Sequence, residues 1–159
     1  MLISSSAFEA NQKIPRQYSG EGRDVSPPLG WSGVPAKARE LALIVDDPDA
    51  PRAEPWVHWV IYQIAVTAVG LPEAVPPSEV LTLPPGALQG RNTSGKIGYM
   101  GPMPPPGHGV HDIRQAPGLD ERNGLGSGDQ NGKGTLRGAA VKNNTSLACP
   151  LLRRRASRA

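Results

Sequence analysis

The spacing of proline and glycine most constrains what this chain can fold into. Of its 159 residues, 18 are proline and 19 are glycine. Proline ends helices because it lacks an N–H donor and clashes with the preceding turn, and it occupies positions 72, 76, 77, 84 and 85. Residues 1–111 keep no helical apolar period over three turns. Short strands between Gly/Pro-rich loops are typical of an all-β sandwich, which is the predicted fold.

Two apolar runs rich in β-branched residues, at 41–45 and 60–64, are the predicted central strands. The segment between them contains Asp47-Pro48-Asp49-Ala50-Pro51 and Trp56-Val57-His58-Trp59. Carboxylates are therefore expected where one strand ends, and a histidine where the next begins. Residues 2–8 and 80–83 are predicted as shorter strands.

Charge divides the chain into a body and a tail. Residues 1–111 carry eight Lys/Arg against ten Asp/Glu, whereas residues 112–159 carry nine against four. The tail is also rich in glycine and contains no aromatic residue, so it buries too little apolar surface to offset the entropy of ordering. We predict one domain at 1–111 and a mostly disordered basic tail at 112–159. Because the body is not basic, nucleic acid is not an expected partner.

The rest of the composition predicts a soluble cytoplasmic protein. No apolar run approaches the roughly 20 residues that span a bilayer, and the N-terminus does not resemble a secretory signal. Cys149 is the only cysteine, so no intrachain disulfide can form.

The polar residues that suggest a site are Asp47, Asp49, His58, His108 and His111. A histidine can donate an N–H to a phosphate-like oxygen while an aspartate accepts its other N–H and fixes the tautomer. We expect Asp47 to hold His58 in this way if the flanking strands are neighbours. The Gly/Pro-rich segment 101–111 would add backbone donors.

Four other interpretations compete with an anion pocket. A metal site lacks the His-x-x-x-His or Cys-x-x-Cys spacing, and a Ser-His-Asp hydrolase lacks the Gly-x-Ser-x-Gly turn. Paired acid–base chemistry by Asp47 and Asp49 is weakened because Asp-Pro-Asp turns usually serve local capping. The last interpretation is that His58 only packs in the core. The co-occurrence of Asp47, His58 and the proline-rich segment favours a binding site, with no metal, cofactor or catalysis expected.

These motifs resemble the phosphatidylethanolamine-binding protein family, in its bacterial branch called Raf-kinase-inhibitor-like. The resemblance spans residues 2–111 and also includes Ser26-Pro27-Pro28-Leu29-Gly30-Trp31 and residues 101–111. It implies an antiparallel Greek-key β-sandwich with a small cavity for phosphate-type anions or phospholipid head groups. Transferred by motif, the implied ligand-binding residues are Asp47, Pro51, Trp56, His58, Pro104, Pro105, Gly107 and His111.

The chain departs from this family after His111. The family continues with Arg or His, then Tyr, and then a long aromatic-rich central strand, whereas Asp112 and Ile113 stand here. We therefore expect a sandwich that is incomplete at its C-terminus, as a deletion or a reading-frame change would produce.

The predicted function is non-catalytic binding of a phosphate-bearing small molecule or phospholipid head group. Asp47 would orient His58, and His58 and His111 would donate to the anion. The alternatives are a protein-interaction module that regulates a kinase or another enzyme, and a small-ester hydrolase. The resemblance also raises a homodimer as an expectation.

Overall fold

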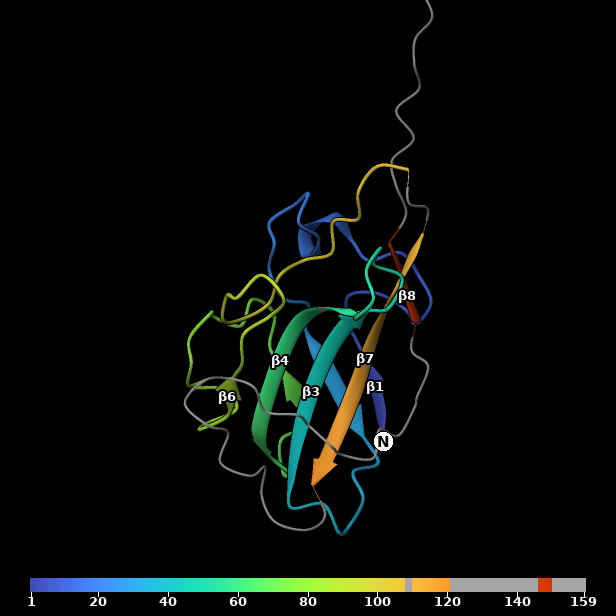
Figure 1. Cartoon of the computed structure of the whole chain (residues 1–159). Helices are drawn as coiled ribbons and strands as arrows, with labels where there is room; N and C mark the ends of the chain where they lie inside the picture. The colour runs from blue at the N-terminus through green and yellow to red at the C-terminus, as the bar shows by residue number, and fades with distance from the viewer. Residues whose placement is uncertain (108–109, 121–145, 150–159) are drawn as a thin grey trace, which may run out of the picture.

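Two antiparallel β-sheets make up the fold of this computed structural model, which describes residues 1–107, 110–120 and 146–149 (Figure 1). The smaller sheet has the order β1-β2-β5, and the larger sheet has the order β6-β4-β3-β7-β8. The strands are β1 (Leu2–Ser4), β2 (Leu29–Ser32), β3 (Glu40–Asp47), β4 (Trp56–Ala65), β5 (Gly70–Leu71), β6 (Leu88–Gln89), β7 (His111–Asp120) and β8 (Ser146–Cys149). The predicted all-β, antiparallel fold class is confirmed.

Helical structure in the described residues amounts to a single 3₁₀ turn, η1 (Arg16–Tyr18). Within these residues, therefore, nothing helical is long and apolar enough to cross a bilayer.

The core lies between the two sheets. From the larger sheet, β3 and β4 bury large apolar side chains in alternation, as expected for strands with one inner face. From the smaller sheet, Ile3, Leu29 and Trp31 complete the same apolar cluster. The polar atoms of the buried indoles are satisfied, because Trp31 Nε1 donates to Ala68 O at 2.7 Å and Trp59 Nε1 donates to Gln89 Oε1 at 2.6 Å.

The two predicted central strands are confirmed, and both extend further than their apolar runs. The predictions of the two shorter strands are less accurate. The N-terminal strand covers only Leu2–Ser4 instead of residues 2–8. Residues 80–83 form no strand, because Val80 makes an isolated bridge to Leu88 and a turn follows at once.

Strand β7 changes the predicted boundary at residue 111. Residues 112–120, assigned from sequence to an irregular tail, pair with β3 from Arg114 opposite Asp46 to Asp120 opposite Glu40. That part of the prediction is wrong, because backbone pairing with β3 overrides the weak strand propensity of a segment containing proline and glycine. The rest of the predicted tail lies outside the described residues, except for β8, which pairs with the start of β7.

Candidate functional site

Three polar side chains gather at one end of the larger sheet because of its topology. Strand β3 is antiparallel to both β4 and β7. Its C-terminal residue, Asp47, therefore lies beside the first residues of β4 and of β7 (Figure 1). This brings His58, the third residue of β4, and His111, the first of β7, to the same end of the sheet as Asp47.

Asp47 is paired with His111. The Nδ1 atom of His111 lies 2.6 Å from Asp47 Oδ2, and both residues are at least 95% buried. The other carboxylate oxygen, Oδ1, accepts the backbone N–H of Asp49 at 2.9 Å. The carboxylate is therefore held at both oxygens, and it fixes the orientation of the His111 ring.

This pairing corrects the sequence prediction that Asp47 would hold His58. His58 is held by a backbone carbonyl instead, because its Nδ1 lies 2.8 Å from the carbonyl oxygen of Met100. The N–H of Met100 in turn donates to the carbonyl oxygen of His58 at 3.0 Å. The sequence could not show which of the two histidines would face the carboxylate.

A β-bulge sets the position of His58. Val45 lies opposite Trp59, whereas the next residue of β3, Asp46, lies opposite Val57. His58 is therefore the extra residue on β4, with no partner of its own in β3. A bulge bends its strand and redirects a side chain, and bulges are frequent next to binding sites.

The Nε2 atom of His58 has no hydrogen-bond partner among the described residues and no solvent-exposed surface. The residue as a whole is 4% exposed. Leaving a buried polar atom unpaired costs roughly 1–3 kcal/mol, so native proteins usually supply a partner from water or a ligand. Nε2 is therefore the atom in this region at which a water molecule or a ligand is expected to bond.

The charge state of His58 follows from its surroundings. Burial lowers the pKa of His58 below its usual value, because desolvation disfavours the charged ring. The bond to Met100 acts in the opposite direction, as do the carboxylates of Asp47, Asp46 and Asp24, but the net change is downward. At neutral pH the ring is neutral.

Asp24 is a member of this region that the sequence analysis did not identify. Its Oδ1 accepts the backbone N–H of Gly101, and its φ is +55°, a conformation that Asp tolerates better than most residues. A Cβ on Gly101 would lie 2.6–2.7 Å from backbone atoms of Tyr18, Ser19 and Gly20. Only glycine therefore allows this close approach. The sequence signal for this close backbone approach was the glycine before Pro102.

The other predicted site residues lie nearer the surface. Trp56 is partly buried, with the Arg52 guanidinium 5.5 Å from its ring centre. Pro104 is partly buried, and three further residues are exposed, namely Pro51, Pro105 and Gly107. His108 lies outside the described residues. Within the part of the chain that the structure covers, no three His, Cys, Asp or Glu side chains are grouped so that they could hold a metal ion.

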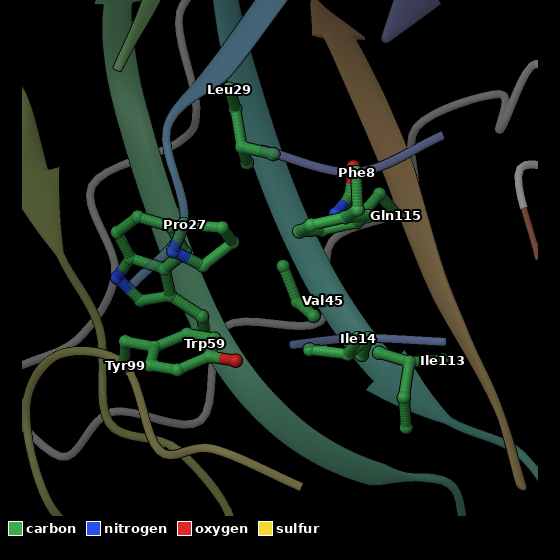
Figure 2. Close-up of a pocket in the computed structure, with 9 residues that line it drawn as sticks. All are labelled: Phe8, Ile14, Pro27, Leu29, Val45, Trp59, Tyr99, Ile113 and Gln115. Atoms are coloured by element: carbon green, nitrogen blue, oxygen red, sulfur yellow. The ribbon is translucent and has the colours of Figure 1, made fainter. Parts of the chain in front are cut away.

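A small cavity in the core is lined by residues of β3, β4 and β7, among others (Figure 2). Its volume is about 10 Å³, and Val45 and Ile113 in its lining are each two residues along the same strands from Asp47 and His111. A volume of this size holds about one water molecule. The remaining lining residues are Phe8, Ile14, Pro27, Leu29, Trp59, Tyr99 and Gln115. The cavity is too small and too apolar for an anion.

Comparison with known proteins links this geometry to one family. Residues 4–115 match the family model described as phosphatidylethanolamine-binding protein. The chain is 49% identical over 111 residues to a UPF0098 protein of Methanothermobacter thermautotrophicus, a match covering 70% of each chain. It is 44% identical over 111 residues to a UPF0098 protein of Pyrococcus abyssi, covering 70% of this chain but 61% of that relative.

Two solved structures share the fold. A putative phosphatidylethanolamine-binding protein homolog from Chlamydia trachomatis has a TM-score of 0.65 and 35% identity, and the match covers 76% of this chain and 74% of that chain. Escherichia coli YbcL, described as a new member of the mammalian PEBP family, has a TM-score of 0.67 and 31% identity, covering 76% and 78% of the two chains.

Proposed function

Because the chain belongs to the phosphatidylethanolamine-binding protein family, we propose that it binds a phosphate-bearing small molecule or a phospholipid head group without converting it. The observation that carries this proposal is the buried, unpartnered Nε2 of His58 beside the fixed Asp47–His111 pair. In the proposal, the ligand oxygen occupies the position next to Nε2.

The surroundings suit a ligand with one polar end. In this proposal the rim of the site is formed by Trp56 and Pro104, which are partly buried, and by Pro51, Pro105 and Gly107, which are exposed. Exposed Met103 adds further apolar surface next to Pro104. Because Nε2 itself has no exposed surface, a ligand that reaches it becomes enclosed, and enclosure strengthens each hydrogen bond by excluding water.

Titration by NMR tests this proposal. The ring resonances of the histidines are followed while inorganic phosphate or phosphoethanolamine is added to the full chain. We expect saturable shifts of the His58 ring. The variant His58→Ala is expected to lose at least tenfold in affinity, whereas Tyr62→Phe on the same strand retains it.

Two results would contradict the proposal. One is a folded protein whose His58 resonances do not respond to either compound. The other is turnover of a small ester or phosphoester that His58→Ala abolishes, which would favour the hydrolase interpretation.

Two further expectations are kept as proposals, the first predicted from composition and the second raised by the resemblance. These are a cytoplasmic location and a homodimer. Sedimentation of the full chain at several concentrations measures the second directly, and a monomer at all of them would dismiss it.

A further inference from the structure

We propose that the site accepts its oxyanion in a protonated form, as the monoanion of a phosphomonoester, because His58 presents a hydrogen-bond acceptor to it. This inference rests on the proposed function and specifies the ligand class of the same site. It also reverses the role expected from sequence, in which His58 would donate to the anion.

The hydrogen bond to Met100 determines which ring nitrogen of His58 carries the proton. A carbonyl oxygen can only accept, so the 2.8 Å contact requires a proton on Nδ1. The Met100 N–H donates back to the His58 carbonyl, so the two residues are tied at two points. In the neutral ring, Nε2 is therefore left with a lone pair and no proton.

The charges around His58 oppose the alternative of a doubly protonated ring meeting a dianion. Asp46 and Asp47 from β3 and Asp24 from the loop before β2 all act on the ring. His111, from β7, is bonded to Asp47. A dianion beside His58 meets the like charges of these carboxylates, and repulsion between like charges is strong where water is excluded. A monoanion meets about half of this repulsion.

A ligand that carries its own proton suits both the neutral ring and the acidic surroundings. The P–OH group of a phosphomonoester monoanion can donate to Nε2, which gives the buried lone pair a partner. Sulfate and phosphodiesters have no such proton near neutral pH. With them, a ligand oxygen and the Nε2 lone pair would both be acceptors, and a buried acceptor without a donor is costly.

Calorimetry with four probes tests this selectivity on the full chain. The probes are inorganic phosphate, phosphoethanolamine, glycerophosphoethanolamine and sulfate, each at several pH values from 5.5 to 8.5. Phosphate monoesters lose their second proton near pH 6. We expect the affinity for phosphoethanolamine to fall up to tenfold per pH unit above that point, and the affinity for inorganic phosphate to fall in the same way from the higher pH at which it loses its own second proton. The diester and sulfate should bind at least tenfold more weakly than the monoesters at pH 5.5.

Three additional measurements locate the proton and the source of the ligand. The ¹⁵N shift of Nε2 should remain that of an unprotonated nitrogen with phosphate bound. Repeating the calorimetry with inorganic phosphate in two buffers should show no proton uptake at pH 5.5, where this probe is already the monoanion. Short-chain phosphatidic acid, a lipid monoester, is compared with phosphoethanolamine. Tighter binding of the lipid would identify a membrane-derived ligand, and equal binding a free metabolite; both agree with monoester selectivity.

The failure of this inference can be distinguished from the failure of the proposed function. If sulfate binds as tightly as phosphate while Nε2 takes up one proton, the acceptor role is wrong but anion binding stands. If the diester binds as tightly as the monoester, monoester selectivity is wrong in the same way. If none of the four probes binds, both proposals fail, and a buried water is the partner of Nε2.

Discussion

At the scale of single residues, Asp47 holds His111 and not His58 as predicted, and this difference has measurable consequences. His111 is bonded to a carboxylate that is itself anchored by the Asp49 N–H. His58 is bonded to a backbone carbonyl and is neutral. Two histidines at one end of one sheet therefore have different hydrogen-bond partners, and substitutions around them should have different effects.

The lowered pKa of His58 predicts a loss of stability in mild acid. The unfolded chain takes up a proton near the ordinary pKa of 6.5, whereas the folded chain resists protonation until a lower pH. Stability from this group is therefore complete above pH 6.5 and declines as pH falls below it, by up to about 1.4 kcal/mol per unit. Denaturant unfolding between pH 5 and pH 8 measures this slope, and His58→Gln should flatten it. An unchanged slope in that variant would show that His58 is not the responsible group.

The Asp47–His111 pair predicts a contrast between two neighbouring aspartates. Asp47→Asn removes a charged acceptor from a buried N–H, so the free energy of unfolding should fall by roughly 1–3 kcal/mol. Asp49→Asn alters an exposed bond to the Asp112 N–H, so it should change stability by less than about 0.5 kcal/mol. Denaturant unfolding at pH 7.5 compares the two variants. Equal effects would mean that the buried Asp47–His111 pair adds no more to the free energy of unfolding than the exposed bond of Asp49.

At the scale of elements, strands β3 and β4 could be predicted because each carries a continuous apolar, β-branched run. Strand β7 could not, because its sequence includes Pro117 and Gly118 and shows little strand propensity. What makes it a strand is the exposed edge of β3, which no local pattern in 111–120 reveals. The bulge at His58 is hidden for the same reason, since a register shift is a property of two strands together.

If β7 packs as described, its inward residues should matter for stability. Ile113 is 1% exposed and contributes to the apolar cluster, whereas the adjacent Asp112 is exposed. Ile113→Ala should reduce the free energy of unfolding by about 2–5 kcal/mol, and Asp112→Ala by less than about 0.5 kcal/mol. Thermal and denaturant unfolding measure both. A mild effect of Ile113→Ala would mean that this segment does not belong to the core.

At the scale of the whole molecule, topology explains why the polar candidate residues could be named from sequence, although their hydrogen-bond partners could not. Strand patterns placed Asp47 and His58 at strand ends, and the resemblance marked His111. The antiparallel order of β4, β3 and β7 brings the three residues to one end of the sheet. The hydrogen-bond partners depend on the rings' exact surroundings, including Met100 and Asp24, whose carbonyl and carboxylate carry no motif of their own. Residue identity was predictable, whereas pairing was a product of the assembled sheet.

Strand β7 has a consequence for how this protein could be assembled. It supplies one of the two buried histidines, yet the main chain of β3 determines its position, and it enters the sheet after a surface segment that includes exposed Val110. A body ending before β7 would therefore leave β3 as an edge strand with unpaired backbone groups, to which an extended peptide can add. The fold thus divides into two fragments, and a short separate peptide with the sequence of β7 would restore both the missing strand and the Asp47–His111 pair.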